Sequence, residues 1–345
     1  RVRDEDEARR AAHRFAAELV EPFELGQGSV HVTASMGIAY TSDADELAEA
    51  LIRNADVAMY RAKDSGRNQL VVFTESIDHD KVEQLATEQA LRAAIQRDEF
   101  ELHYQPVVDL RSGGMGHAEA LVRWHRPGHG LVMPGDFIPL AEETGLIVPL
   151  GWWVLEEACR TALSWPELPG GGHVQIAVNL SARQLAAPDL LQTVQRILIK
   201  TSLGASQLCF EITESDLVRD LRAAVDAVEG LKSLGVRIAI DDFGTGYSSL
   251  DYIRHFAMAD YLKIDRAFVD GVEREGSQEE AIVTAAIGMA KSLGFVVVAE
   301  GVETLFQMEA LKALDCDLAQ GFLFSRPVPA DQAIELMAEP SPTGG

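Results

Sequence analysis

Eight short apolar runs follow one another between Glu101 and Pro327, and most are separated by stretches with helical spacing. The helix-like stretches include DLLQTVQRILIKTSL and EEAIVTAAIGMAKSLG. Alternating strands and helices over about 250 residues are typical of a (β/α)8 barrel. The sequence therefore predicts an α/β fold with such a barrel. The eight runs are ELHYQPVVDL, GHAEALVRW, VQIAVNLS, QLCFEITES, VRIAIDDFG, DYLKIDRAF, FVVVAEGVE and AQGFLFSRP.

The segment before the barrel reads as part of a second domain. HVTASMGIAY alternates like a strand, an apolar helical stripe follows and ends near Gly66, and QLVVF returns as a strand. A β-α-β fragment of this size cannot cover both faces of its sheet, and we expect further sequence to precede it. We predict a fragment at 1–76, a linker helix at 77–84 and the barrel domain at 85–340.

Composition limits the partners and the compartment. The formal charge is −24, so the surface repels nucleic acid polymers and offers no cue for anionic lipid. The apolar run GLIVPLGWWVLEEA is too short to span a bilayer. Three widely spaced cysteines favour a reducing compartment over a disulfide framework or a zinc site. We therefore expect a cytoplasmic chain without membrane contact of its own, although a preceding segment could tether the full-length protein.

Unusual polar residues stand near the ends of these strands, and in a parallel barrel the carboxyl ends converge on one rim. For a single carboxylate there, a helix cap or a surface ion pair would be the better explanation. Several together repel one another unless a cation neutralises them, and oxygen donors select Mg²⁺ or Mn²⁺. Hard cations beside a lysine and a spare carboxylate favour phosphate ester hydrolysis. The residues concerned are Glu119, Asn179, Glu211, Glu214, Asp241, Asp242, Lys263, Asp265, Glu300, Glu303 and Gln320.

These residues lie in a series of motifs that resembles the EAL phosphodiesterases of bacterial cyclic di-GMP signalling. The resemblance runs from about Leu85 to Met337, and the motif that names the family is Glu119–Ala120–Leu121. It implies a modified (β/α)8 TIM-like barrel whose substrate is cyclic di-GMP and whose product is linear pGpG. The other matching stretches are YQPVVDL, FIPLAEETGLI, VNLSARQL, EITES, DDFGTGYSSL, LKIDRAFV, AEGVET and AQGFLFSRP.

The resemblance also implies roles for individual residues. Glu300 resembles the general base, and Lys263 resembles the lysine that orients the attacking water and supports the metal site. Ca²⁺ is expected to bind without supporting turnover. The expected ligands of two Mg²⁺ or Mn²⁺ ions are Glu119, Asn179, Glu211, Asp241 and Asp242. The expected substrate contacts are Gln105, Arg123 and Gln320, and the residues expected to stabilise the DDFGTGYSS loop are Glu214 and Glu303.

The N-terminal part resembles the C-terminal half of a GGDEF diguanylate cyclase domain, an α+β fold, through ASMGIA and ADVAMYRAKDSGRNQ. The hairpin that names that family does not occur in the sequence. By family resemblance we expect a homodimer formed through the EAL part and coupled to the DDFGTGYSS loop. Two other readings stay open: a catalytically silent EAL module that senses cyclic di-GMP, and another Mg²⁺-dependent barrel enzyme with a lysine base.

Overall fold

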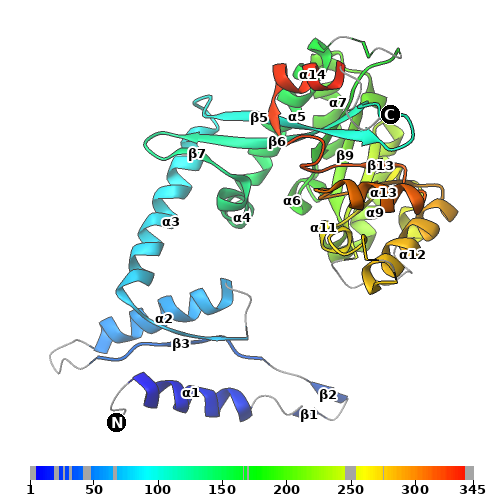
Figure 1. Ribbon diagram of the computed structural model, residues 1–345. Coiled ribbons are helices and arrows are strands. Elements are labelled where there is room, and N and C mark those ends of the chain that lie inside the picture. Colours follow the sequence, from blue (N-terminus) through cyan, green and yellow to red (C-terminus); the bar gives the residue numbers. More distant parts are fainter. Residues whose placement is uncertain are drawn as a thin grey trace. The chain divides into compact units, whose positions relative to one another are not determined.

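The structure is a computed structural model, and its chain forms two compact units, Arg1–Gln89 and Ala90–Gly345 (Figure 1). The helix α3 (Glu75–Ala94) spans the boundary between them and contains the linker predicted at 77–84. The predicted domain limits themselves stay a prediction. The described residues are 5–18, 23–25, 28–30, 33–41, 48–64, 68–165, 167–168, 171–244, 254–274 and 276–338.

The first unit contains the predicted β-α-β element. The strands β3 and β4 pair in parallel, as a helical crossover between them requires. Gly37 allows the helix to approach the sheet, because a Cβ there would lie 2.1 Å from the carbonyl oxygen of Ala55. The elements are α1 (Glu5–Glu18), an antiparallel pair β1 (Phe23–Leu25) and β2 (Gly28–Val30), β3 (Met36–Ile38), α2 (Ala48–Asp64) and β4 (Leu70–Val72).

The second unit is a closed eight-stranded barrel, and each predicted run overlaps one of its strands. The strand order is β5-β13-β12-β11-β10-β9-β8-β6, and pairing of β5 with β6 closes the ring. The predicted barrel is therefore confirmed. Its strands are β5 (Phe100–Asp109), β6 (His117–Arg126), β8 (Gln175–Asn179), β9 (Leu208–Thr213), β10 (Arg237–Phe243), β11 (Tyr261–Ile264), β12 (Val296–Ala299) and β13 (Leu318–Ala319).

The barrel departs from a fully parallel one at β5, which is antiparallel to both of its neighbours. The cause is the short connection to β6, because only antiparallel strands can be joined without a crossover helix. Asp109 shapes this turn: its Oδ1 accepts hydrogen bonds from the backbone N–H groups of Arg111 and Ser112. Short strands extend the outer ends of the pair, namely β7 (Gly130–Val132) on β6 and β14 (Val328–Pro329) on β5.

Helices cover the outside of the barrel, and their caps agree with the sequence. Thr304 and Ser277, for example, each accept a hydrogen bond from the backbone of the third residue of the helix that follows. The helices are α4 (Pro134–Thr144), α5 (Ile147–Ser164), α6 (Ala182–Leu185), α7 (Leu190–Thr201), α8 (Glu214–Arg219), α9 (Leu221–Ser233), α11 (Arg266–Val269), α12 (Gln278–Ser292), α13 (Leu305–Ala313) and α14 (Ala330–Ala338), with short 3-10 turns η1 (Ala205–Gln207) and η2 (Arg254–Phe256).

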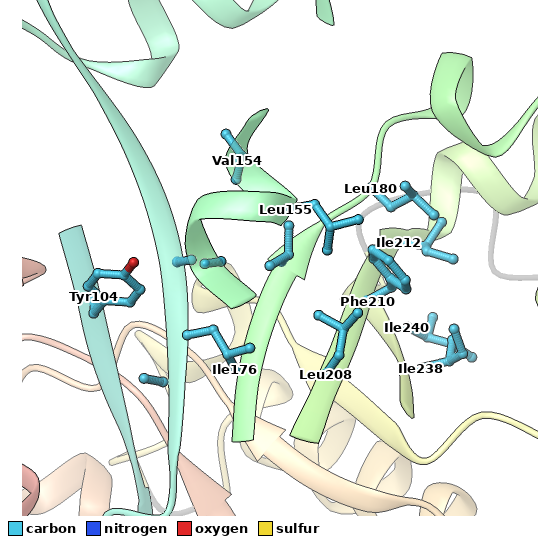
Figure 2. Close-up of a cluster of buried hydrophobic side chains, with 14 of the residues drawn as sticks. Tyr104, Val154, Leu155, Ile176, Leu180, Leu208, Phe210, Ile212, Ile238 and Ile240 are labelled. Carbon is cyan, nitrogen blue, oxygen red and sulfur yellow. The ribbon is translucent and has the colours of Figure 1, made fainter. Parts of the chain in front are cut away.

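Strand alternation separates an apolar outer layer from the barrel interior. Figure 2 shows the outer layer, where Ile176 and Phe210 lie beside Leu155 of α5 and Ile240 lies beside Ile238, and all of these side chains are buried. The residues between them in sequence point the other way, because successive side chains of a strand face opposite sides. Small residues such as Ala177 and Ala239 line the interior, which leaves room for larger polar side chains near the rim.

Among the described residues, no helix is both long and apolar enough to cross a membrane. The three cysteines, Cys159, Cys209 and Cys316, are free and buried. Burial raises the pKa of the Cys159 thiol to about 12, so these residues act as small apolar core side chains rather than as reactive thiolates.

Candidate active site

A buried lysine surrounded by carboxylates occupies the barrel interior near the rim. Lys263, in β11, has a side chain that is 3% exposed. Its Nζ lies 2.8 Å from Oε2 of Glu211, in β9, and 3.2 Å from Oδ2 of Asp241, in β10. Oε1 of Glu300, directly after β12, is 2.6 Å away, and Oε2 of Glu119 is 3.9 Å away. Four strands thus bring four acids to one ammonium group.

Amide side chains fix the orientation of Glu119. Its Oε1 accepts a hydrogen bond from Nδ2 of Asn179 (2.9 Å), and its Oε2 accepts one from Nε2 of Gln320 (2.7 Å). The same Nε2 donates to Oε1 of Gln105, whose Nε2 donates to the carbonyl oxygen of Ser325. Because every bond to Glu119 is donated, the network favours its ionised form.

The expectation that Glu119 lies near the carboxyl end of its strand is wrong. It is the third of ten residues in β6. The strand continues beyond the barrel to pair with β7, for example Trp124 with Val132. The rim therefore crosses β6 near its beginning, which places Glu119 beside residues from the ends of the other strands.

Burial and mutual repulsion raise the pKa values of some of these acids but not of others. Burial raises the pKa of Glu300 to about 8, although Lys263 opposes the shift. Burial also raises the pKa of Glu211 well above its ordinary value. Burial has the same tendency at Glu119, but Lys263 and the donated hydrogen bonds outweigh it and lower the pKa. The pKa of Lys263 is raised well above its ordinary value, because the surrounding carboxylates outweigh the effect of burial.

The oxygen atoms needed for divalent cations are already close together. Asp241, Asp242 and Glu300 each offer a carboxylate oxygen, and the three atoms lie within 4.8 Å of one another. Burial, followed by the neighbouring Asp241, raises the pKa of Asp242, so a cation would relieve an existing repulsion. Glu119 and Glu211 belong to the same cluster through Lys263, whose Nζ also contacts Asp241 and Glu300. Carboxylate oxygens without His or Cys suit Mg²⁺ or Mn²⁺.

The start of the DDFGTGYSS loop is held by Glu214. Its Oε2 accepts a hydrogen bond from the backbone N–H of Gly244 (2.9 Å). Asp242 and Gly244 have φ values of 53° and 98°, and at Gly244 a Cβ would also lie 2.7 Å from Phe268. A glycine is therefore required at 244. The rest of the loop, including Gly246, lies outside the described residues.

A cavity of about 270 Å³ opens onto this cluster. Arg266 and Glu303 stand at its mouth, where Nη2 of Arg266 lies 2.9 Å from Oε1 of Glu303. Phe322, 44% exposed, adds an aromatic surface. The lining residues are Gln105, Glu119, Leu121, Asp241, Lys263, Arg266, Glu300, Gly301, Glu303, Gln320, Gly321 and Phe322.

A larger cavity of about 410 Å³ lies on the outer side of β6, against α4 and α5. Its walls are mainly apolar, and its lining includes Asn179 and Glu211 but neither Asp241 nor Glu300. We call the smaller one the acidic cavity, because Glu119, Asp241 and Glu300 line it together with Lys263.

Most of the residues predicted from the sequence meet in this one place, but two differ from their expected surroundings. Arg123 is buried, donates from Nη1 to the carbonyl oxygen of Val122, and is not among the residues that line the acidic cavity. Glu303 pairs with Arg266 at the mouth. Their expected roles, and those of the other predicted residues, stay predictions. Arg266 and Phe322 were not predicted, because a single arginine or phenylalanine beside a motif carries no distinguishing pattern.

Comparisons with known proteins agree with this geometry. The EAL domain model matches residues 88–327, and the diguanylate cyclase GGDEF domain model matches residues 1–69. The bifunctional diguanylate cyclase/cyclic di-GMP phosphodiesterase MucR of Pseudomonas aeruginosa is 44% identical over 98% of this chain and 49% of its own length. The cyclic di-GMP phosphodiesterase NbdA of the same organism is 40% identical over 94% of this chain and 41% of its own length.

This chain thus spans about half or less of these relatives. A solved structure described as the PaMucR phosphodiesterase in complex with c-di-GMP is 48% identical, with a TM-score of 0.67, and the match covers 72% of this chain and 99% of that one. With an EAL model matching most of the sequence and a solved EAL relative matched over nearly its whole length, the chain belongs to the EAL domain family.

Proposed function

We propose that this chain is a metal-dependent phosphodiesterase that hydrolyses cyclic di-GMP to linear pGpG. The observation that carries the proposal is the convergence of Glu119, Glu211, Asp241 and Glu300 on Lys263 in the barrel interior. Each residue that the family resemblance assigns to the metal site or to catalysis is present. The expected Mg²⁺ or Mn²⁺ ligands are all oxygen donors, which supports a hard cation.

Bound divalent cations would polarise a phosphoryl oxygen and lower the pKa of a water molecule. The proposed ligands on the chain are Glu119, Asn179, Glu211 and Asp241 for one ion and Asp242 for the second. Asn179 and Gln320 donate to Glu119 and hold its carboxylate in place. These contacts fix the ligand orientation before substrate arrives, which is how supporting residues contribute to metal sites.

The reaction forms a bond between phosphorus and the water oxygen and breaks the bond between phosphorus and a 3′ oxygen. Glu300 accepts the proton of the water, and cations bound beside its carboxylate would keep it ionised near neutral pH. Lys263, 2.6 Å from Glu300, holds this carboxylate against the barrel interior. The proton then passes to the departing 3′ oxygen, which leaves pGpG.

The test is direct analysis of products by chromatography. The purified chain with cyclic di-GMP and Mg²⁺ or Mn²⁺ should yield pGpG, and excess chelator should stop the reaction. Ca²⁺ should support binding but not turnover, because its longer bonds displace the attacking water. Glu300→Gln should bind substrate and lose about 10²- to 10⁴-fold in rate. Glu119→Ala and Asp241→Ala should abolish turnover.

Glu309→Gln is the matched control, because this carboxylate of α13 has a side chain that is 66% exposed and should leave the rate unchanged. Binding of cyclic di-GMP without product would favour the sensor reading. A chain that neither binds nor cleaves cyclic di-GMP would contradict the proposal.

We propose that the EAL part forms a homodimer, on the strength of the family resemblance and the Glu214–Gly244 contact that ties the loop to the site. Sedimentation at micromolar protein should show a dimer, and a fully active monomer would refute this. A cytoplasmic location stays a prediction, which cell fractionation of the full-length protein would test.

A further inference from the structure

The acidic cavity contains few positively charged groups, although the proposed substrate carries two negative charges. Cyclic di-GMP has two phosphodiesters, and the cleaved one would bind at the metal cluster. Among the described residues that line the cavity, Lys263 and Arg266 are the cationic ones. Lys263 is buried and surrounded by carboxylates. Since the chain as a whole has a charge of −24, the second phosphate needs a local cation.

Arg266 is positioned for that purpose by its surroundings. It is the first residue of α11, directly after the helix-capping Asp265, whose Oδ1 accepts from the N–H of Ala267. Its side chain is 50% exposed and lies against the backbone of Gly301. A Cβ at Gly301 would be 2.3 Å from Cγ of Arg266 and 2.6 Å from its Cβ. Gly301 also has a φ of 69°, so a glycine is needed there for two reasons.

Two acids orient the guanidinium without enclosing it. Nη2 lies 2.9 Å from Oε1 of Glu303, and Nε lies 3.5 Å from Oδ2 of Asp270. These contacts with the described residues leave Nη1 for a ligand. An arginine fixed on two sides loses little freedom on binding, and its planar donors match the oxygens of a phosphate. Arg123, the expected phosphate contact, does not line this cavity.

We propose that Arg266 binds the second, uncleaved phosphate of the cyclic dinucleotide and so selects substrates with two phosphodiesters. This inference rests on the proposed function. Gly301 and Glu303 act as positioning residues, because Gly301 gives the arginine space and Glu303 sets its direction.

Steady-state kinetics with two substrates test the idea. Arg266→Gln should raise KM for cyclic di-GMP about 10-fold, the loss expected for one charged hydrogen-bonding contact, and change kcat by less than about twofold. Bis(4-nitrophenyl) phosphate has a single phosphodiester, so its hydrolysis should not change. Arg111→Gln is the control, because Arg111 is 68% exposed and pairs with Asp315 away from the cavity.

Two further variants separate binding from structure. Gly301→Ala should displace Arg266 and raise KM for cyclic di-GMP by a similar factor. Arg266→Lys should give an intermediate KM, because lysine keeps the charge but lacks the planar N–H donors of the guanidinium. Equal losses on both substrates, or an unchanged KM in Arg266→Gln, would overturn the inference while the parent still hydrolyses cyclic di-GMP. A parent that neither binds nor hydrolyses cyclic di-GMP would instead overturn the proposed function, and this inference with it.

Discussion

Replacement of Lys263 by methionine tests how the site is held together in the absence of metal. The two side chains have similar length, so the change removes the charge and leaves little cavity. In the parent, the pKa of Lys263 lies well above its ordinary value and those of Glu300 and Glu211 are raised. Loss of the ammonium would leave Asp241 and Glu119 without their nearest cation.

The structure sets the size of the effect. Removal of one partner of a buried ion pair costs about 3 to 5 kcal/mol. The variant can limit the loss by taking up a proton, and protonating a carboxylate with an ordinary pKa near 4 costs about 4 kcal/mol at pH 7 and about 1.4 kcal/mol at pH 5. We therefore expect a loss of about 4 kcal/mol in the free energy of unfolding at pH 7, or a fall in Tm of about 10 °C.

The sign of the pH dependence follows from the same groups. In the variant, loss of the ammonium group raises the pKa values of Glu300 and Glu211 further in the folded state, because Lys263 opposes that shift in the parent. The stability that depends on protonation of these groups is therefore present at low pH and lost as pH rises. The raised pKa of Lys263 in the parent maintains its contribution below about pH 10.4, the ordinary lysine value. The difference in stability between parent and variant should therefore grow from pH 5 to pH 8.

The assay is thermal unfolding in chelator at pH 5, 6.5 and 8, followed by circular dichroism. Lys291→Met is the matched control: this lysine pairs with Asp315 and Asp317 at the surface, and such pairs contribute about 1 kcal/mol or less. If Lys263→Met melted within about 2 °C of the parent at pH 8, or if the difference did not shrink on acidification, the explanation would be wrong.

Two further predictions concern protons. Metal binding at pH 7 should release up to about one proton, because burial raises the pKa of Glu300 to about 8 and a cation beside this carboxyl would lower it again; calorimetric heats that are identical in buffers of different ionisation enthalpy would contradict this. Asp260 accepts from Lys232, Arg237 and the N–H of Ile238, bonds that outweigh burial and lower its pKa. Asp260→Asn should cost about 3 kcal/mol at pH 7, and the cost should shrink below about pH 4 as this stabilisation is lost; urea unfolding at pH 7 and pH 3 would measure it.

Period-two alternation explains why the barrel and much of the site could be predicted from the sequence. In β9, Leu208, Phe210 and Ile212 are buried in the outer layer, so Glu211 between them must face inward. The same reasoning places the side chains of Asp241 and Lys263 in the barrel interior. When several strands each carry a charged residue between buried apolar neighbours, the interior is the one place where these charged side chains can meet.

The reversed first strand and the mouth of the cavity depend on contacts that no local pattern encodes. Gln320 donates to Gln105, which is 215 residues away in sequence, and Arg266 meets Gly301 only because β11 and β12 are neighbours. Strand propensity does not distinguish a parallel from an antiparallel neighbour. The direction of β5 follows from a turn built by Asp109, whose sequence is also compatible with an ordinary surface loop.

Buried oxygen atoms without hydrogen bonds indicate how much stability the fold loses to form this site. Among the described residues, Glu211 Oε2, Glu214 Oε1 and Gln320 Oε1 are buried acceptors without a hydrogen-bond donor. The Lys263 ammonium is 2.8 Å from Glu211 Oε2 but does not meet it in hydrogen-bond geometry. Each such acceptor costs about 1 to 3 kcal/mol, and native proteins contain few of them. Glu211 and Gln320 lie with Lys263 in the barrel interior, which fits a site whose oxygens are arranged for a cation, because the lysine compensates the charge without saturating the lone pairs.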